Sequence, residues 1–303
     1  MDPTMVRRAG QVADGALGWL GRMRASFALP RDLPDHEIDG NALKALADLA
    51  LAGGTVRREA VAGEAGARTA EELLDYAWRE FRFGELLLAL QRQAPAASHP
   101  TEIYSLFAAA GYRHPRLDSL AEHLAGLRAA AVPEQAPNRR LAVLAANRRL
   151  GLPDPPDTAD LVARSWLGGT PEPWMLDANT AHGVAHTVCH LTDYAAHPGG
   201  LPPLLQEYLH RWLPVWVEVF TETRSWDLLG ELLIVAGCLD RPHGYADAWE
   251  QLALAQRPDG MLPNGVNPPP SDPEQAFRDR CHPTVVAVVA GTLTVSRALA
   301  VAS

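Results

Sequence analysis

The feature that most constrains the fold of this chain is the recurrence of apolar residues at helical spacing in segment after segment. Runs that alternate apolar and polar residues are almost absent, and only 284–295 is ambiguous between helix and strand. Pro, Gly, Asp and Asn separate the segments, as at 152–156, where they are expected to end helices. The pattern predicts an all-α fold of about twelve helices, over residues 4–26, 40–53, 69–93, 100–111, 116–131, 137–150, 157–169, 179–196, 203–223, 226–239, 244–256 and 274–300.

About twelve helices joined by short loops make about six hairpins, which can stack as an open solenoid or close into a ring around a concavity. We expect the closed form, an (α/α) toroid with a central cavity, over an irregular bundle or open solenoid. The Pro-rich stretches 130–138 and 151–157 are short enough to be loops, so we expect one domain over residues 1–303. The longer stretch 257–272 is either a lid over the cavity mouth or a surface loop.

Composition and absent motifs exclude several functions. The net charge is -9 and no basic stripe occurs, so nucleic acid is not an expected partner. The three cysteines are far apart and the longest apolar run, 283–295, is too short to span a bilayer, so we expect a cytoplasmic protein with no membrane contact. Lys44 is the only lysine, and Gly-x-Ser-x-Gly, Gly-x-Gly-x-x-Gly and Cys-x-x-Cys motifs are missing, which argues against P-loop proteins, serine hydrolases and dinucleotide enzymes.

The most informative predicted helix, 179–196, carries a stripe of histidines. At 100° per residue its polar face spans roughly 80° and holds His182, His186, His190 and Asp193. No Lys, Arg or Glu occurs from 180 to 197, so the stripe is expected to face a cavity or another helix. It could transfer protons through His186 oriented by Asp193, bind a metal, bind an anionic substrate, or only hydrogen-bond between packed helices. We favour proton transfer.

A second cluster lies in 226–235, where Asp227 and Glu231 are one turn apart on an otherwise apolar helix. If both face the cavity of the histidines, their pKa values are raised and one acts as acid or base, or the pair binds a substrate ammonium group. The alternative for Asp227 is a position near a helix N-terminus, favoured by the helix dipole.

A third cluster precedes the apolar C-terminal run, where Arg278, Arg280 and His282 occur together. Arginine is suited to bidentate binding of a carboxylate, phosphate or sulfate, although a surface salt-bridge cluster is an alternative. We expect the catalytic residues to be His186, Asp193, His282, Asp227 and Glu231. The expected substrate-binding residues are His182, His190, Tyr104, Glu102, Trp226, Arg278 and Arg280, although a core tyrosine explains Tyr104 almost as well.

Three motifs carry a family resemblance. Gln256-Arg-Pro-Asp259-Gly260 resembles a turn that recurs in α/α toroids such as isoprenoid cyclases and protein prenyltransferase β-subunits. The order of the segments 186–194, 226–233 and 280–286 resembles an uncharacterised actinobacterial toroid family associated with natural-product and antibiotic gene clusters, over about residues 30–300. Within that pattern, His190 and Cys281 stand where tyrosines are expected.

The resemblance implies an enzyme that closes a nitrogen heterocycle such as an aziridine by expelling an anionic leaving group, sometimes with a small partner subunit. We therefore predict a natural-product cyclase or lyase that needs no redox cofactor and no obligatory metal. Its small-molecule substrate is free or bound to a carrier protein, and the chain acts with a small partner subunit or as a homodimer. One alternative is a zinc-dependent lyase or transferase, and the other is a non-catalytic partner or binding subunit. The zinc ligands would come from His182, His186, Cys189, Cys238, Cys281 and His282.

Overall fold

The computed structural model describes residues 1–132, 134–154, 157–266 and 271–302, and this part of the chain is built from helices. It contains 14 α-helices joined by turns and short 3-10 segments, and no strand is assigned within the described ranges. The ambiguous run 284–295 is helical. The all-α prediction is therefore confirmed.

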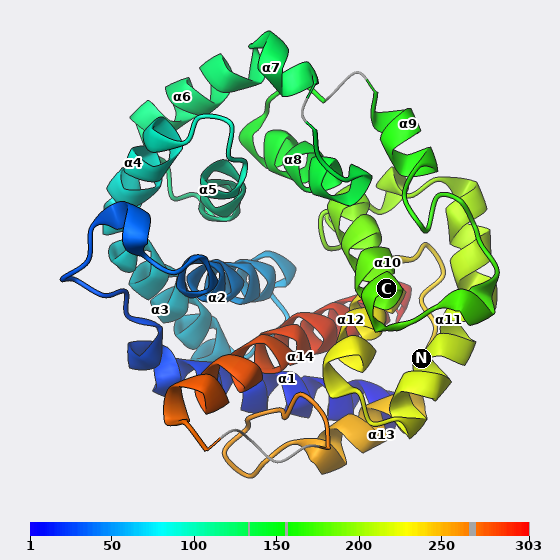
Figure 1. Ribbon diagram of the computed structural model, residues 1–303. Helices are drawn as coiled ribbons and strands as arrows, with labels where there is room; N and C mark the ends of the chain where they lie inside the picture. Colours follow the sequence, from blue (N-terminus) through cyan, green and yellow to red (C-terminus); the bar gives the residue numbers. More distant parts are fainter. Residues whose placement is uncertain (133, 155–156, 267–270, 303) are drawn as a thin grey trace.

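Six helices surround the centre of the view in Figure 1. They are α2 (Gly40–Glu59), α5 (His99–Ala109), α8 (Pro137–Leu150), α10 (Ala178–Thr192), α12 (Trp226–Cys238) and α14 (Pro273–Ala302). Each contacts the next in this order, and α14 contacts α2. The series is therefore closed, and it brings the last helix of the chain against one of the first.

The other helices lie outside this inner series (Figure 1). They are α1 (Pro3–Met23), α3 (Glu64–Glu80), α4 (Glu85–Gln93), α6 (Pro115–Ala125), α7 (Arg128–Ala131), α9 (Thr158–Ala163), α11 (Pro203–Glu222) and α13 (Ala246–Ala255). The two layers share one buried apolar cluster that runs from Met5 to Leu293. This arrangement supports the predicted single domain.

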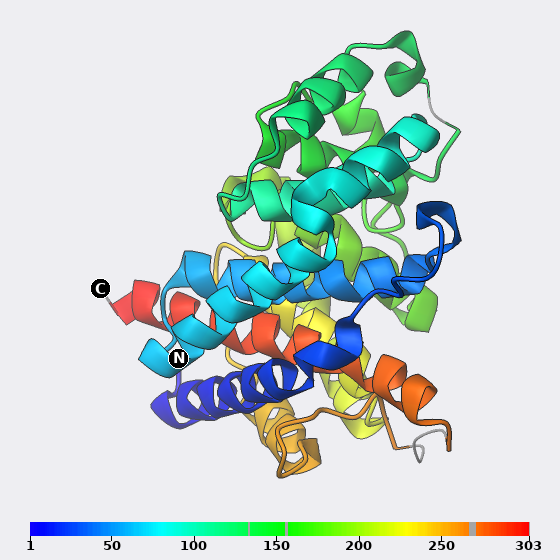
Figure 2. The same cartoon turned by 90° about the vertical axis from the view of Figure 1, so that its left-hand side faces the viewer.

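Neighbouring inner helices run in the same direction. In α2 and α14, Asp48 contacts His282 in the first half of each helix, and Glu59 contacts Ser296 nearer the end. Figure 2 shows these two helices side by side. Two other inner pairs match in the same way. Between α8 and α10 the contacts are Asn138 with Gly183 and Arg149 with Asp193, and between α10 and α12 they are His182 with Glu231 and Cys189 with Cys238. Parallel inner helices in a closed series gather several N-terminal halves at one end, and the α/α toroid stays a prediction.

Local chemistry sets the helix boundaries that the apolar pattern could not locate. The predicted helix 69–93 is wrong as a single element, because Phe83 and Gly84 adopt positive φ angles of 54° and 95° and divide it into α3 and α4. The predicted helix 116–131 is likewise divided into α6 and α7. Helix α10 begins at a capping box, in which Asp177 and Thr180 each accept a hydrogen bond from the other's backbone N–H.

The Gln-x-x-Asp-Gly turn has a structural role. The Gln256 side-chain amide donates to the backbone carbonyls of Val12 and Gly260, both at 2.9 Å, so it connects the end of α13 to α1. Gly260 has a φ of 89°, and a Cβ there would lie 2.0 Å from the carbonyl oxygen of Gly15. Only glycine fits this approach, and the turn joins the last outer helix to the first.

Helix α14 contains one segment, Gln275–Val301, that is long and apolar enough to cross a membrane by length and composition. The helix packs against α1, α2 and α12, and 56% of the segment's most apolar window is buried inside the protein. A core helix of a soluble protein has the same properties, so cytoplasmic location stays a prediction.

Candidate functional site

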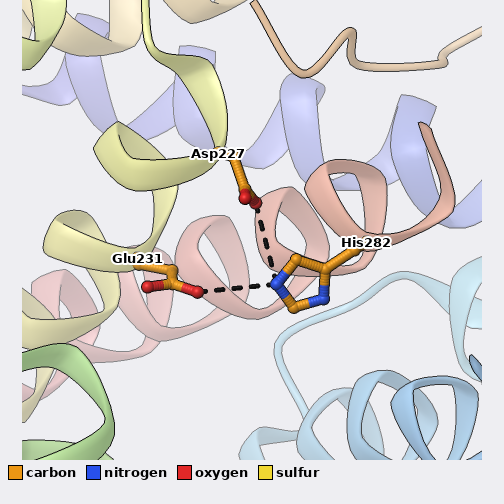
Figure 3. A group of neighbouring side chains, drawn as sticks. All are labelled: Asp227, Glu231 and His282. Carbon is orange, nitrogen blue, oxygen red and sulfur yellow. Dashed lines mark hydrogen bonds and ion pairs between the residues drawn. The ribbon is translucent and has the colours of Figure 1, made fainter. Parts of the chain in front are cut away.

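The inner helices bring three carboxylates together around His282 of α14. Its Nδ1 atom lies 3.1 Å from Oδ2 of Asp48 on α2. Its Nε2 atom faces two carboxylates of α12, 3.5 Å from Oε1 of Glu231 and 3.7 Å from Oδ1 of Asp227. Figure 3 shows the ring of His282 pointing between these two carboxylates. The imidazole of His282 therefore contacts carboxylates on both of the inner helices that flank α14.

The cluster continues to a second histidine and to the only lysine. Nδ1 of His182 on α10 lies 2.8 Å from Oε2 of Glu231, so Glu231 contacts an imidazole through each of its two oxygens. Nζ of Lys44 lies 3.1 Å from Oδ2 of Asp48. The result is a continuous chain of contacts over four inner helices, Lys44–Asp48–His282–Glu231–His182.

Helical spacing places these groups. Positions 44 and 48, 227 and 231, and 182, 186 and 190 are each four apart, so each set shares a helix face. The sequence analysis missed Asp48, although a signal existed: it is the only charged residue from 45 to 56 in an apolar helix. A lone carboxylate of this kind needs a partner, by the same reasoning that selected Glu231.

The cluster contains strongly perturbed ionisations. Burial alone would lower the pKa of His282, but hydrogen bonds to Asp48 and Glu231 raise it to about 10. Burial alone would raise the pKa of Glu231, but hydrogen bonds from His182 and His282 lower it to about 2. Burial is likewise outweighed at Asp48, where the hydrogen bond from His282 and the charge of Lys44 lower the pKa of the carboxyl group. Opposite charges are therefore held close together at the inner wall.

Asp227 differs from the other two carboxylates. Burial raises its pKa, and the negative charge of Glu231 raises it further. Its Oδ1 atom is buried and has no hydrogen-bond partner. A buried carboxylate oxygen without a partner is energetically costly, so this atom marks a place where a cation or a donor group would be stabilised.

The cluster borders an open cleft with a volume of about 1370 Å³, to which His182 and Asp227 contribute. Trp226 and Arg280, both predicted to bind substrate, line the same cleft, as do Arg224 and Arg257. A small molecule in this cleft would therefore meet an imidazole, a carboxylate and guanidinium groups.

The stretch proposed as a lid or surface loop forms part of the cleft wall. Several of its residues between 257 and 266 line the cleft, and the backbone carbonyl of Asn264 accepts a hydrogen bond from the N–H of Trp226 at 3.1 Å. The loop is thus attached to the start of α12. Residues 267–270 of the predicted lid lie outside the described residues.

The prediction that Asp193 orients His186 is wrong. The Asp193 carboxylate accepts hydrogen bonds from Nε and Nη2 of Arg149 at 2.8 and 2.6 Å, and these two side chains are only 12% and 9% exposed. Asp193 follows the last turn of α10 with a φ of 47°, which turns it out of the stripe that an uninterrupted helix would continue. It is therefore a structural ion-pair partner of α8.

The three histidines of the predicted stripe do lie along α10, but their surroundings differ. The His186 ring is 6.3 Å from that of His182 and 5.9 Å from that of His190, between ring centres. His186 is exposed, yet the surrounding helices lower its pKa by desolvation. Burial, the charge of His186 and nearby arginines hold the pKa of His190 far below its usual value. Only His182 of the three contacts the carboxylate cluster.

Three other predicted substrate-binding residues lie elsewhere. Tyr104 is fully buried, donates to Asp118 at 2.6 Å and stacks on Trp78, so it is the core tyrosine that the alternative described. Glu102 forms an ion pair with Arg139 at 2.6 Å. The side chain of Arg278 is 52% exposed and lies 3.6 Å from Asp39.

The predicted zinc ligand set is also not assembled. The three cysteines are buried and free, and the Cys281 thiol donates to the backbone carbonyl of Arg278. Among the described residues, the group whose donor atoms could share one metal ion is Asp227, Glu231 and His282, all within 4.8 Å of one another. His282 is the one member of that group that the zinc alternative named.

The comparison with protein families gives a match over nearly the whole chain. The model for the family described as "Domain of unknown function (DUF6895)" matches residues 13–292. The chain belongs to the DUF6895 family. No curated protein and no solved structure matches it. The family description assigns no activity, so the function of this member has to be argued from the geometry of the site.

Proposed function

We propose that this chain is an enzyme that moves protons on a small molecule bound in the cleft, with His182 as the general base. The observation that carries the proposal is the pair of His182 and Glu231. Glu231 is only 7% exposed and holds Nδ1 of His182 at 2.8 Å, while the ring of His182 is 37% exposed and lines the cleft. A buried carboxylate that binds one imidazole nitrogen fixes the ring and leaves the other nitrogen for substrate.

The specific reaction we propose is closure of a nitrogen heterocycle such as an aziridine in natural-product biosynthesis. Nε2 of His182 accepts the proton of a substrate N–H as the nitrogen forms a bond to carbon. The bond from that carbon to the leaving group breaks, and the leaving group departs as an anion with the electron pair. Arg280, with Arg224 and Arg257 on the same cleft, is suited to stabilise that anion.

The cleft favours this reaction by holding both ends of one substrate. Its volume of about 1370 Å³ exceeds that of a small amine, so a larger substrate or one presented by a carrier protein also fits. Positioning of reacting atoms within one molecule contributes strongly to the rate of a ring closure. A partner subunit and a homodimer both stay predictions.

A turnover screen tests the proposal. The purified chain is incubated with vicinal amino sulfate and amino phosphate esters, and both the released anion and the cyclised amine are measured by mass spectrometry. Wild type is expected to turn over at least one ester class, and His182→Ala should lose about 10²–10⁴-fold in rate because a general base contributes that much. Added imidazole should restore part of the lost activity through the open cleft.

The control is Asp279→Asn, because Asp279 lines the same cleft without a contact to His182. It should keep its activity within about threefold. A His182→Ala protein that is folded and fully active would refute the assigned base. If the whole screen gives no product with the folded wild-type chain, the non-catalytic alternative replaces this proposal.

A further inference from the structure

Asp227, Glu231 and His282 hold their donor atoms close enough together to share one ion. Nε2 of His282 lies 3.5 Å from Glu231 and 3.7 Å from Asp227, at or beyond the limit of a hydrogen bond. The three donor atoms lie within 4.8 Å of one another, with both carboxylates facing Nε2 of His282 (Figure 3). Ligands around a tetrahedral ion with bonds of about 2.0–2.1 Å are separated by roughly 3.3 Å, close to the two distances from Nε2.

A second observation concerns Asp227 alone. Its Oδ1 atom is buried, has no hydrogen-bond partner and lies 3.7 Å from Nε2 of His282. Glu231 is itself an acceptor and cannot donate to this atom, and Nε2 of His282 at 3.7 Å is too far for a hydrogen bond. An acceptor in this position is satisfied by a cation placed between Asp227, Glu231 and Nε2.

The third observation is that the outer partners of such a site are already in place. Metal-binding histidines usually donate their other ring N–H to a carboxylate, which fixes the tautomer and the direction of the ring. Asp48 accepts such a hydrogen bond from Nδ1 of His282 at 3.1 Å, and its side chain is 15% exposed. His182 holds the second oxygen of Glu231 in the same manner at 2.8 Å. Each of these two ligands is therefore oriented by a neighbour on another helix.

We propose that Asp227, Glu231 and His282 bind one divalent transition-metal ion, Zn²⁺ or Mn²⁺, with Asp48 as the positioning residue of His282. An imidazole with two carboxylates suits these ions better than Mg²⁺ or Ca²⁺, which take mostly oxygen ligands. Asp227 also lines the cleft, so a coordination position of the ion faces substrate. There the ion would act as a Lewis acid beside His182, in contrast to the metal-free reaction that the sequence predicted.

Binding measurements test this site without any substrate. The chain is freed of metal with a chelator and titrated with ZnCl₂ or MnCl₂ by calorimetry, and Mn²⁺ binding is also followed by electron paramagnetic resonance. One ion per chain is expected. Asp227→Asn and His282→Ala should each weaken binding more than tenfold, because each removes a ligand. Asp48→Asn should weaken it about 10–100-fold, because it removes an outer partner.

Asp279→Asn is the matched control, since it makes the same substitution on the same cleft outside the ligand group, and its affinity should stay within about twofold of wild type. Circular dichroism and a thermal melt show that each variant is folded. Lack of stoichiometric binding at about 1 mM ion, or equal affinity in wild type and folded Asp227→Asn, would overturn the site. Turnover by the chelated chain with no bound ion would overturn only the Lewis-acid role of the ion, whereas an ion bound without turnover would overturn only the proposed reaction.

Discussion

The ion pair of Arg149 and Asp193 gives the sharpest test of which histidine-stripe residues are structural. Arg149 donates two hydrogen bonds to one carboxylate oxygen of Asp193, and the two side chains are 9% and 12% exposed. Asp193→Asn keeps the shape of the side chain and tolerates the left-handed backbone at this position, whose φ is 47°. It removes the negative charge and leaves the Arg149 guanidinium buried without its counter-ion.

Breaking one side of a buried pair costs about 3–5 kcal/mol. For a chain of this size each kcal/mol shifts Tm by about 2–4 °C, so Asp193→Asn should melt roughly 6–20 °C below wild type. Urea denaturation followed by circular dichroism gives the free energy of unfolding directly. The folded variant should keep its turnover within about threefold, because Asp193 does not contact His186.

The control for this experiment is Arg68→Ala. Arg68 pairs with Glu64 at 3.0 Å, but the two side chains are 67% and 87% exposed, so the change should alter the free energy of unfolding by less than about 0.5 kcal/mol. A loss below about 1 kcal/mol in Asp193→Asn would refute the buried-pair reasoning. A stable Asp193→Asn that has lost about 100-fold in activity would restore the catalytic role predicted from sequence.

Two further predictions concern the framework around the site. Gly260→Ala should lower the free energy of unfolding by more than about 2 kcal/mol. The reason is that the φ of Gly260 is 89° and the new Cβ would lie 2.0 Å from the carbonyl oxygen of Gly15. A loss below about 1 kcal/mol in urea denaturation would contradict this. Burial and the hydrogen bond to Asp118 raise the pKa of Tyr104 to about 12. The folded state favours the neutral phenol, so the stability that Tyr104 contributes is full below about pH 10 and is lost as the pH rises towards 12. Over that range the Tm of Tyr104→Phe should fall less steeply than that of wild type. Identical slopes in the two proteins would refute the raised pKa of Tyr104.

The fold was accessible from sequence where the apolar period is long and regular. The predicted ranges 203–223 and 226–239 match α11 and α12 within one residue at each end, because Pro and short polar loops interrupt the pattern there. The division of residues 69–93 into two helices could not be predicted from the sequence pattern. Leu and Ala continue the period through Phe83, and the backbone reversal depends on how Gly84 packs against Trp78 and His114.

The site was accessible in part, for a similar reason. Glu231 was selected as a carboxylate on an apolar helix, His182 as part of a histidine stripe, and His282 from its cluster with two arginines. The structure brings these three together. The pairing of His186 with Asp193 failed because the periodicity argument extended the helix to residue 196, four residues beyond the end of α10 at Thr192. Asp48 was missed because its partner is 234 positions away in the sequence, a contact that only the closed series of helices creates.

The central claim is that His182, held by Glu231, is the base that acts on substrate. The most direct test compares His182→Ala with His186→Ala in the same turnover assay, since the two rings are neighbours on one helix, 6.3 Å apart between ring centres, and only the first contacts Glu231. We expect a loss of about 10²–10⁴-fold in His182→Ala and less than about tenfold in His186→Ala, with both proteins folded. Full activity in His182→Ala together with loss of activity in His186→Ala would contradict the account and would identify His186 as the base.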